Sequence, residues 1–152
     1  MIKIMFVCHG NICRSPMAEF VMRDIVKKAD LSDKIHIASS ATSREEIGNP
    51  VHHGTRKKLA EYGLSVDGKT ARQITKEDYN NYDYIIVMDS YNLHNLQRII
   101  GSDTKNKVYI LLDFADGGDI ADPWYTGNFD RTYDDILKGC KGLFAKITTE
   151  DL

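Results

Sequence analysis

The sequence predicts an α/β fold: a single domain built on a four-stranded parallel sheet with helices on both faces. Two observations lead to this prediction. Short apolar runs alternate along the chain with longer segments whose apolar residues recur at helical spacing, which is typical of a parallel sheet covered on both sides. The chain has 152 residues with no internal repeat and no linker, so we expect residues 1–152 to form one domain.

The strands are expected at four short segments, of which Ile2–Val7 and Tyr84–Met88 are typical of buried strands. These segments are Ile2–Val7, Lys34–Ser39, Tyr84–Met88 and Val108–Leu112. Helices are expected at Pro16–Ala29, His52–Tyr62, Ser90–Ile100 and Phe129–Ile147. Pro16 is a start signal, because a missing N–H costs nothing in the first helical turn. Gly63 is a stop signal for the second helix.

The most informative segment is the loop after the first strand, Cys8-His9-Gly10-Asn11-Ile12-Cys13-Arg14-Ser15. It ends at a helix N-terminus, where free N–H groups and the helix dipole favour an anion. A short curled loop can turn its amides toward the oxygens of a phosphoryl group, and Arg14 can hold two of those oxygens. The same surroundings favour a thiolate at Cys8. The loop therefore predicts a phosphate-binding site with Cys8 as nucleophile; the alternative is a buried strand-end cysteine.

Other residues of the loop support this chemistry. Gly10 permits a backbone conformation that other residues resist, and the Ser15 hydroxyl can donate to the Cys8 sulfur. His9 could raise the positive potential beside the thiolate or face the solvent, and we expect it to face the solvent. Cys13 is expected to protect Cys8 by forming a reversible disulfide on oxidation; the alternative is a packing role.

A second group of reactive residues follows the fourth strand, within the aperiodic segment Asp113–Asn128. This segment contains Asp122-Pro123-Trp124-Tyr125. Because it leaves the carboxyl end of a strand, it can reach the same sheet edge as the Cys8 loop. Asp122 could protonate a leaving oxygen, and Asp89 is the second candidate for this role. Trp124 and Tyr125 could line a slot for a flat aromatic group. The alternative is that Asp122 only starts a turn and Trp124 anchors the core.

Composition limits the classes of partner. The net charge of −2 suggests no nucleic-acid partner, and no apolar stretch reaches membrane length. The first residues lack the flanks of a signal peptide. Three cysteines without disulfide spacing favour a reducing compartment, so we expect a cytoplasmic protein with no membrane association.

Taken together, Cys8–Glu19 and Asp122-Pro123-Trp124-Tyr125 resemble the low-molecular-weight protein tyrosine phosphatases. The resemblance runs along nearly the whole chain. It also covers Ser39–Ser43, Ile47–Pro50, Ala71–Ile74, Met88–Asp89 with Asn92–Leu93, and the last helix.

The resemblance implies a protein tyrosine phosphatase that works through a phosphocysteine intermediate. In it, Cys8 is the nucleophile, Arg14 the phosphate clamp, Ser15 the thiolate donor and Asp122 the general acid. Asn11 would hold the loop, with Ser39 as its support. No cofactor and no metal are expected, the substrate would be a phosphotyrosine-containing protein, and phosphate or vanadate would inhibit. The substrate-binding set would be His9, Gly10, Asn11, Ile12, Cys13, Ser15, Trp124 and Tyr125.

Three positions bear on how closely the chain follows this family. Arg44-Glu45-Glu46 stands where members often carry an aromatic or bulky residue, so one wall of the slot is charged. Lys69 stands where many members have His, which leaves a supporting contact open. Ile12 offers an apolar pocket floor that favours phosphotyrosine, whereas a relative with Thr at this position is a protein arginine phosphatase; a mere packing role is the alternative.

Parts of the same pattern also occur in proteins with other functions. An arsenate reductase of the same fold needs two further cysteines for a disulfide relay, and Cys140 lies on the expected core stripe of the last helix. A zinc module could use Cys8, Cys13 and the His52-His53 pair, but structural zinc ligands usually come in closer pairs. A non-catalytic phosphate-binding domain would not need Cys8, Arg14 and Asp122 together. Phosphoarginine remains a further candidate substrate.

Overall fold

The structure is a computed structural model that describes residues 1–152, and at its centre is the predicted four-stranded parallel sheet. The strands lie in the order β2-β1-β3-β4. They span Ile2–Cys8 (β1), Ile35–Ala41 (β2), Tyr84–Val87 (β3) and Val108–Ile110 (β4). In the register of the sheet, Cys8 is paired with Ala41 and Val7 with Val87. β1 is therefore a central strand, and its carboxyl end lies between β2 and β3.

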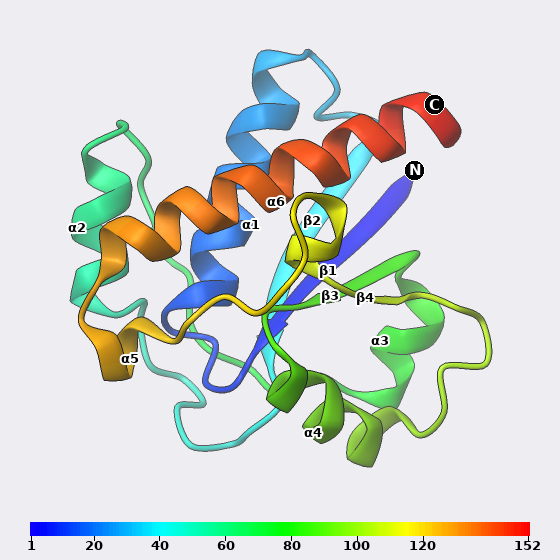
Figure 1. The fold of residues 1–152 in the computed structure, drawn as a ribbon, viewed down its shortest axis with the longest axis horizontal. Helices are drawn as coiled ribbons and strands as arrows, with labels where there is room; N and C mark the ends of the chain where they lie inside the picture. Colours follow the sequence, from blue (N-terminus) through cyan, green and yellow to red (C-terminus); the bar gives the residue numbers. More distant parts are fainter.

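Helices cover both faces of this sheet (Figure 1). They span Arg14–Lys28 (α1), His53–Ala60 (α2), Lys76–Asn81 (α3), Ser90–Ile100 (α4), Pro123–Thr126 (α5) and Phe129–Glu150 (α6). A short 3₁₀ helix, Leu111–Phe114 (η1), follows β4. The long helices α1 and α6 pack on one face, and α3 and α4 pack on the other. No helix combines the length and the apolar character that a membrane span requires.

The side chains of β1 explain why its apolar run is continuous. Ile4, Phe6 and Cys8 belong to the core formed with α1 and α6, whereas Met5 and Val7 belong to the core formed with α3 and α4. Successive side chains of a strand point to opposite faces, and both faces of this strand are closed to solvent. The Cys8 side chain is thus directed to the α1 side of the sheet.

Several element boundaries differ from the predicted ones. α1 begins at Arg14, so Pro16 is its third residue rather than its first; this is tolerated because N–H groups of the first turn have no partner within the helix. β4 ends at Ile110, opposite the last residue of β3, and the next residues turn inward as η1. α3 has no counterpart among the predicted helices, although Thr75 and Asp78 form a capping box at its start.

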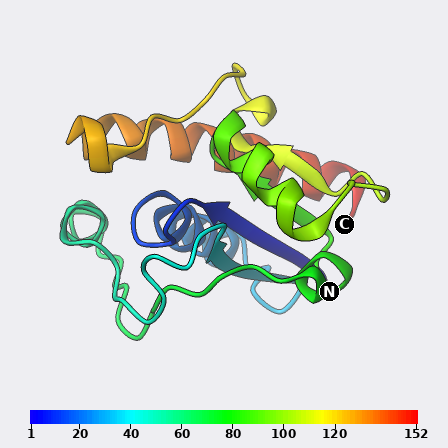
Figure 2. The same cartoon turned by 90° about the horizontal axis from the view of Figure 1, so that it is seen from below.

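The Cys8–Ser15 loop and the segment that leads into α5 lie at the end of the sheet opposite the chain termini (Figure 2). The segment after β4 reaches this end because η1 packs closely on α6. A Cβ atom on Gly142 would lie 1.9 Å from the Phe114 carbonyl oxygen, so only glycine leaves room for this approach. After η1 the chain runs back to α5, whose N-cap is Asp122.

Candidate active site

The Cys8 sulfur lies at the centre of the curled loop between β1 and α1. The backbone N–H groups of Asn11 and Ser15 both donate to Cys8 Sγ at 3.4 Å, and Ser15 Oγ lies 3.1 Å from it. These N–H groups are free because they belong to the loop and to the first turn of α1. Three groups able to donate hydrogen bonds therefore converge on the sulfur.

Asn11 holds the loop in this conformation. Its backbone is left-handed, with φ at 60°, which Asn tolerates better than most residues. Its buried amide donates to Ser15 Oγ at 2.8 Å and to Ser39 Oγ at 3.0 Å, while its oxygen accepts from the Arg72 N–H at 3.3 Å. Because Ser15 Oγ already accepts from Asn11, its own proton is available to Cys8 Sγ or to the Ser40 carbonyl.

Beneath the loop lies a network of charged and polar groups that joins the buried Glu19 and Ser39 to the half-exposed Arg23. The sequence did not reveal the parts of Glu19 and Arg23 in it. Ser39 Oγ donates to Glu19 Oε1 at 2.5 Å, and Arg23 pairs with the same carboxylate at 2.6 Å. Lys69 Nζ donates to the Ser39 carbonyl at 2.8 Å and lies 3.5 Å from Glu19. Burial lowers the pKa of Lys69, although Glu19 works against this. The contact that the sequence left open at Lys69 is thus present, and it leads through Ser39 to Asn11.

The Arg14 side chain is buried and bound on three sides. Its Nη1 atom donates to Asp89 Oδ2 at 2.6 Å and to the Ile120 carbonyl at 2.9 Å, and its Nη2 atom lies 3.4 Å from Asp122 Oδ2. Burial opposes its charge, but Cys8 and Asp89 together raise the pKa of Arg14. Asp89 is also the N-cap of α4. This carboxylate, the second candidate acid, binds and orients the guanidinium.

Asp122, the N-cap of α5, also lies next to the Arg14 guanidinium. One oxygen accepts from the Trp124 N–H at 3.0 Å, which caps α5, and the other faces Arg14. Asp122 therefore does start a turn, and it also enters the site. The alternative that Trp124 anchors the core is wrong, because this residue is 57% exposed; Tyr125 is 84% exposed. Both aromatic residues line the cavity above Cys8.

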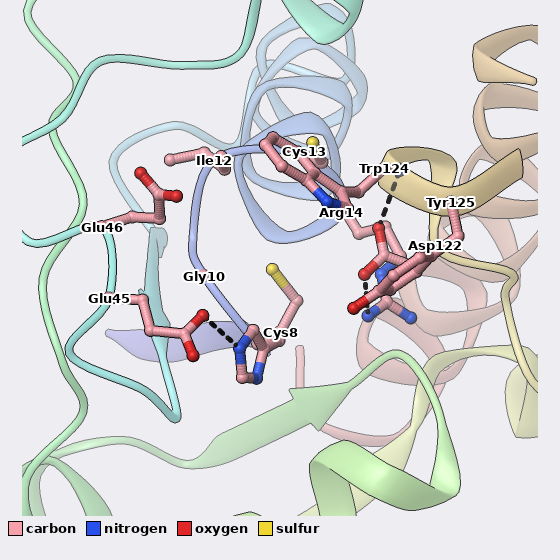
Figure 3. A pocket seen from close by; sticks show the side chains of 11 residues that line it. Cys8, Gly10, Ile12, Cys13, Arg14, Glu45, Glu46, Asp122, Trp124 and Tyr125 are labelled. Carbon is pink, nitrogen blue, oxygen red and sulfur yellow. Dashed lines mark hydrogen bonds and ion pairs between the residues drawn. The ribbon is translucent and has the colours of Figure 1, made fainter. Parts of the chain in front are cut away.

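This cavity has a volume of about 340 Å³ and opens to the surface between two walls. Figure 3 shows Cys8 Sγ pointing into it, with Asp122, Trp124 and Tyr125 on one side and Glu45 and Glu46 on the other. The floor and the remaining wall come from the loop residues His9, Gly10, Ile12, Cys13 and Arg14. All the residues predicted to bind substrate line this cavity except Asn11 and Ser15, which support the loop from below.

His9 and Cys13 differ in their surroundings. The His9 side chain is half exposed, as expected, but it also pairs with Glu45 at 2.8 Å across the rim. Cys13 is buried, and burial, followed by the charge of Cys8, raises its pKa to about 12. Cys13 thus stays a thiol near neutral pH, and it lines the same cavity as Cys8. Cys140 is fully buried in the core between α6 and α1.

The structure does not bring together the residues of the zinc module or of the arsenate reductase relay. No cluster of three or more His, Cys, Asp or Glu side chains has a geometry that could hold a metal ion, so the four residues of the zinc hypothesis do not form a centre. Cys140 does not line the cavity, so it is not placed to take part in a disulfide relay from Cys8.

Comparison with known proteins gives one consistent result. The family model for low molecular weight phosphotyrosine protein phosphatases matches residues 3–151. The low molecular weight protein-tyrosine-phosphatase YfkJ of Bacillus subtilis is 43% identical, over 99% of this chain and 98% of its own. The crystal structure of YfkJ superposes with a TM-score of 0.96 over 100% of this chain and 98% of the other.

Two further solved structures bear on the substrate. The low molecular weight protein tyrosine phosphatase SP-PTP of Streptococcus pyogenes is 44% identical, covers 99% of this chain and 96% of its own, and has a TM-score of 0.89. An arginine phosphatase of Drosophila is 28% identical, covers 99% and 100%, and has a TM-score of 0.90. The fold thus serves enzymes that are named for two different phosphorylated residues.

Proposed function

Because the chain belongs to the low molecular weight phosphotyrosine protein phosphatase family, we propose that this protein-tyrosine-phosphatase uses Cys8 as its nucleophile, Arg14 as its phosphate clamp and Asp122 as its general acid. The observation that carries the proposal is the position of Cys8 Sγ, at the floor of the cavity and surrounded by loop donors. Arg14 and Asp122 lie together on one side of the same cavity. Residues 1–152 would act as one phosphatase domain.

The first half of the reaction transfers the phosphoryl group to sulfur. The Cys8 thiolate attacks phosphorus, the bond from phosphorus to the tyrosyl oxygen breaks, and the protonated Asp122 gives its proton to that oxygen. The loop N–H groups and the Arg14 guanidinium hold the equatorial oxygens, whose charge is spread in the transition state. The tyrosine leaves, and a phosphocysteine remains at Cys8.

The second half returns the enzyme to its starting state. The Asp122 carboxylate takes a proton from a water molecule, which attacks phosphorus. The bond between phosphorus and sulfur breaks, inorganic phosphate is released, and the Cys8 thiolate leaves with the Ser15 hydroxyl as its hydrogen-bond donor. Cys8 must stay reduced to react, and the cytoplasm is a reducing compartment. We therefore propose that the enzyme works in the cytoplasm.

The walls of the cavity support phosphotyrosine as the substrate. Ile12 presents an apolar side chain at the cavity, and Trp124 and Tyr125 provide flat apolar surface at its mouth. An aryl group buries well against such surfaces. A guanidinium would instead require polar partners for its N–H groups. The same cradle would accept inorganic phosphate and vanadate as inhibitors.

The nucleophile can be tested by trapping the intermediate. During turnover of p-nitrophenyl phosphate in the presence of a chelator, acid quenching and peptide mapping should find phosphate on Cys8. Cys8→Ser should lose about three orders of magnitude in rate or more, whereas the control Cys140→Ala should stay active. Substantial activity in Cys8→Ser, phosphate on another residue, or a loss of activity in chelator that a metal restores would refute the mechanism.

The substrate needs a separate comparison. Peptides of the same sequence carrying either phosphotyrosine or phosphoarginine should be hydrolysed by the wild-type enzyme, and phosphotyrosine should give the higher kcat/KM. Faster hydrolysis of phosphoarginine would overturn the choice of substrate and leave the cysteine mechanism in place.

A further inference from the structure

His52 stands at the start of α2, outside the catalytic loop, and its ring is the centre of an aromatic cluster. The cluster consists of His52, His53, Trp124 and Phe129. The His52 ring stacks on His53 with 4.2 Å between ring centroids and on Phe129 with 5.4 Å, and it meets Trp124 edge-on at 5.6 Å. Three segments of the chain, α2, α5 and the start of α6, thus meet at one imidazole.

Hydrogen bonds fix both the imidazole and the backbone of His52. His52 Nδ1 accepts from the Gly54 N–H at 3.0 Å and thereby caps α2. The His52 N–H donates to the Ile12 carbonyl at 2.9 Å, so its backbone is tied to the phosphate loop. Phe129 fills the space against Gly54, where a Cβ atom would lie 2.3 Å from the Phe129 ring. The ring of His52 is therefore a rigid support anchored to the loop that holds the phosphate.

Trp124 is held much less firmly. It belongs to a four-residue helix, α5, and more than half of the residue's surface is exposed. Its ring has one aromatic neighbour, which is His52. Yet Trp124 forms a wall of the cavity above Cys8. The position of this wall therefore depends on a contact from outside the cavity.

From this arrangement we infer that His52 is a positioning residue, which holds the Trp124 wall in place and so sets the affinity of the site for the aryl group of the substrate. The inference rests on the proposed function, because an aryl phosphate is the ligand that the wall would contact. It concerns binding of the aryl group and leaves the phosphate cradle unaffected, because the cradle is held by Asn11 and Arg14.

The same contact makes the wall sensitive to pH. His52 Nδ1 accepts a hydrogen bond, so the ring is neutral, and a protonated imidazole has no acceptor left for the Gly54 N–H. The groups that influence its charge are His53, Asp122 and Glu46. Burial, followed by His53, lowers the pKa of His52, while Asp122 and Glu46 oppose this.

The direction of the pH effect follows from this shift. Since the pKa in the folded protein lies below that of an unfolded histidine, the cap stabilises the fold fully above the unfolded pKa. That stability is lost as the pH falls through the folded pKa. On the acid side the cap should break, and the support of Trp124 should weaken with it.

Fluorescence tests the inference without relying on activity, because Trp124 is the single tryptophan of the chain. His52→Asn keeps a side chain that can cap α2 and removes the ring. His53→Asn is the matched control, since His53 stacks on His52 but has no ring contact with Trp124. Relative to wild type and to His53→Asn, His52→Asn should show stronger quenching of Trp124 by acrylamide. It should also lack an acid-side change in emission that the other two proteins share.

Kinetics provide the second measurement. In His52→Asn the KM for p-nitrophenyl phosphate should rise about three- to tenfold, the scale of one aromatic contact. Its kcat and the Ki of inorganic phosphate should stay within about twofold, because a single contact outside the cradle is removed. His52→Phe keeps a ring but can neither titrate nor cap α2, so it should lose the acid-side change in emission and show a KM between those of wild type and His52→Asn.

Equal emission, quenching and KM in His52→Asn and His53→Asn would overturn the inference. A rise in the phosphate Ki that matches the rise in KM would also overturn it, since the cradle itself would then have moved. If the enzyme failed to hydrolyse aryl phosphates at all, the proposed function would fall, but the fluorescence comparison would still decide the contact between His52 and Trp124.

Discussion

Arg14 donates from Nη1 to Asp89 Oδ2 at 2.6 Å, and this bond joins the phosphate loop to the N-terminus of α4. The other Asp89 oxygen accepts from the Asn92 N–H at 2.7 Å. Both oxygens of the carboxylate are thus engaged, and the guanidinium is oriented before any phosphate binds. Pre-orientation of this kind lowers the reorganisation needed in the transition state.

Arg14→Lys should be nearly as damaging as Arg14→Ala, with a loss of about two to three orders of magnitude in kcat. A planar guanidinium can hold two phosphate oxygens while it stays bound to Asp89, whereas an ammonium is a point charge. Steady-state kinetics with p-nitrophenyl phosphate measure the effect. A Lys variant with a near wild-type rate would show that charge alone is sufficient.

Asp122→Ala should slow substrates with poor leaving groups most. Phenyl phosphate and phosphotyrosine need a proton on the leaving oxygen, and general-acid catalysis is worth about two to four orders of magnitude. p-Nitrophenolate leaves without that proton, so its ester is the internal control. The measurement is the dependence of kcat/KM on leaving-group pKa in both proteins. Equal losses across the series would mean that Asp122 only caps α5 and shapes the loop.

Peroxide should inactivate the enzyme reversibly through Cys8 and Cys13. The thiolate of Cys8 reacts with peroxide to give a sulfenic acid and hydroxide, and the Cys13 thiol then displaces water to form a disulfide. The pKa of Cys13 is raised to about 12, so Cys13 stays protonated near neutral pH and Cys8 should be oxidised first.

The test compares wild type with Cys13→Ser after a peroxide pulse. The variant should keep much of its initial activity but recover less of it with a thiol, because Cys8 is then open to further oxidation. Identical recovery in both proteins would leave Cys13 with a packing role.

The acidic rim should select against acidic phosphopeptides. Glu45 and Glu46 lie on one wall of the cavity, and Glu45 also contacts the half-exposed His9 at 2.8 Å. Glu45→Gln should raise kcat/KM for an acidic phosphotyrosine peptide about two- to fivefold at low salt, and less at high salt. p-Nitrophenyl phosphate has no flanking residues, so its kcat/KM should not change. An equal response of both substrates would assign the segment to a solvated turn.

The sequence predicted the elements whose local signals agree with their packing. α4 has the predicted bounds, Ser90–Ile100, because the apolar stripe and the Asp89 cap both mark it. β4 is shorter than predicted, since strand length depends on the partner strand, and β3 ends at Val87. α3 was missed because it is short and mostly polar, although its Thr75 cap was readable.

The candidate site also combines features that local sequence signals predict with features that only packing decides. The sequence by itself predicted the Cys8 loop, because the spacing of its residues is a local property. It also predicted that Asp122 reaches the same sheet edge, because both segments leave the carboxyl ends of parallel strands. Only the tertiary structure showed that Lys69 and Glu19 support Ser39, that Asp89 orients Arg14, and that His52 touches Trp124. These contacts join residues far apart in the chain, and they exist only because the packing of helices on the sheet brings those side chains within a few ångströms of one another.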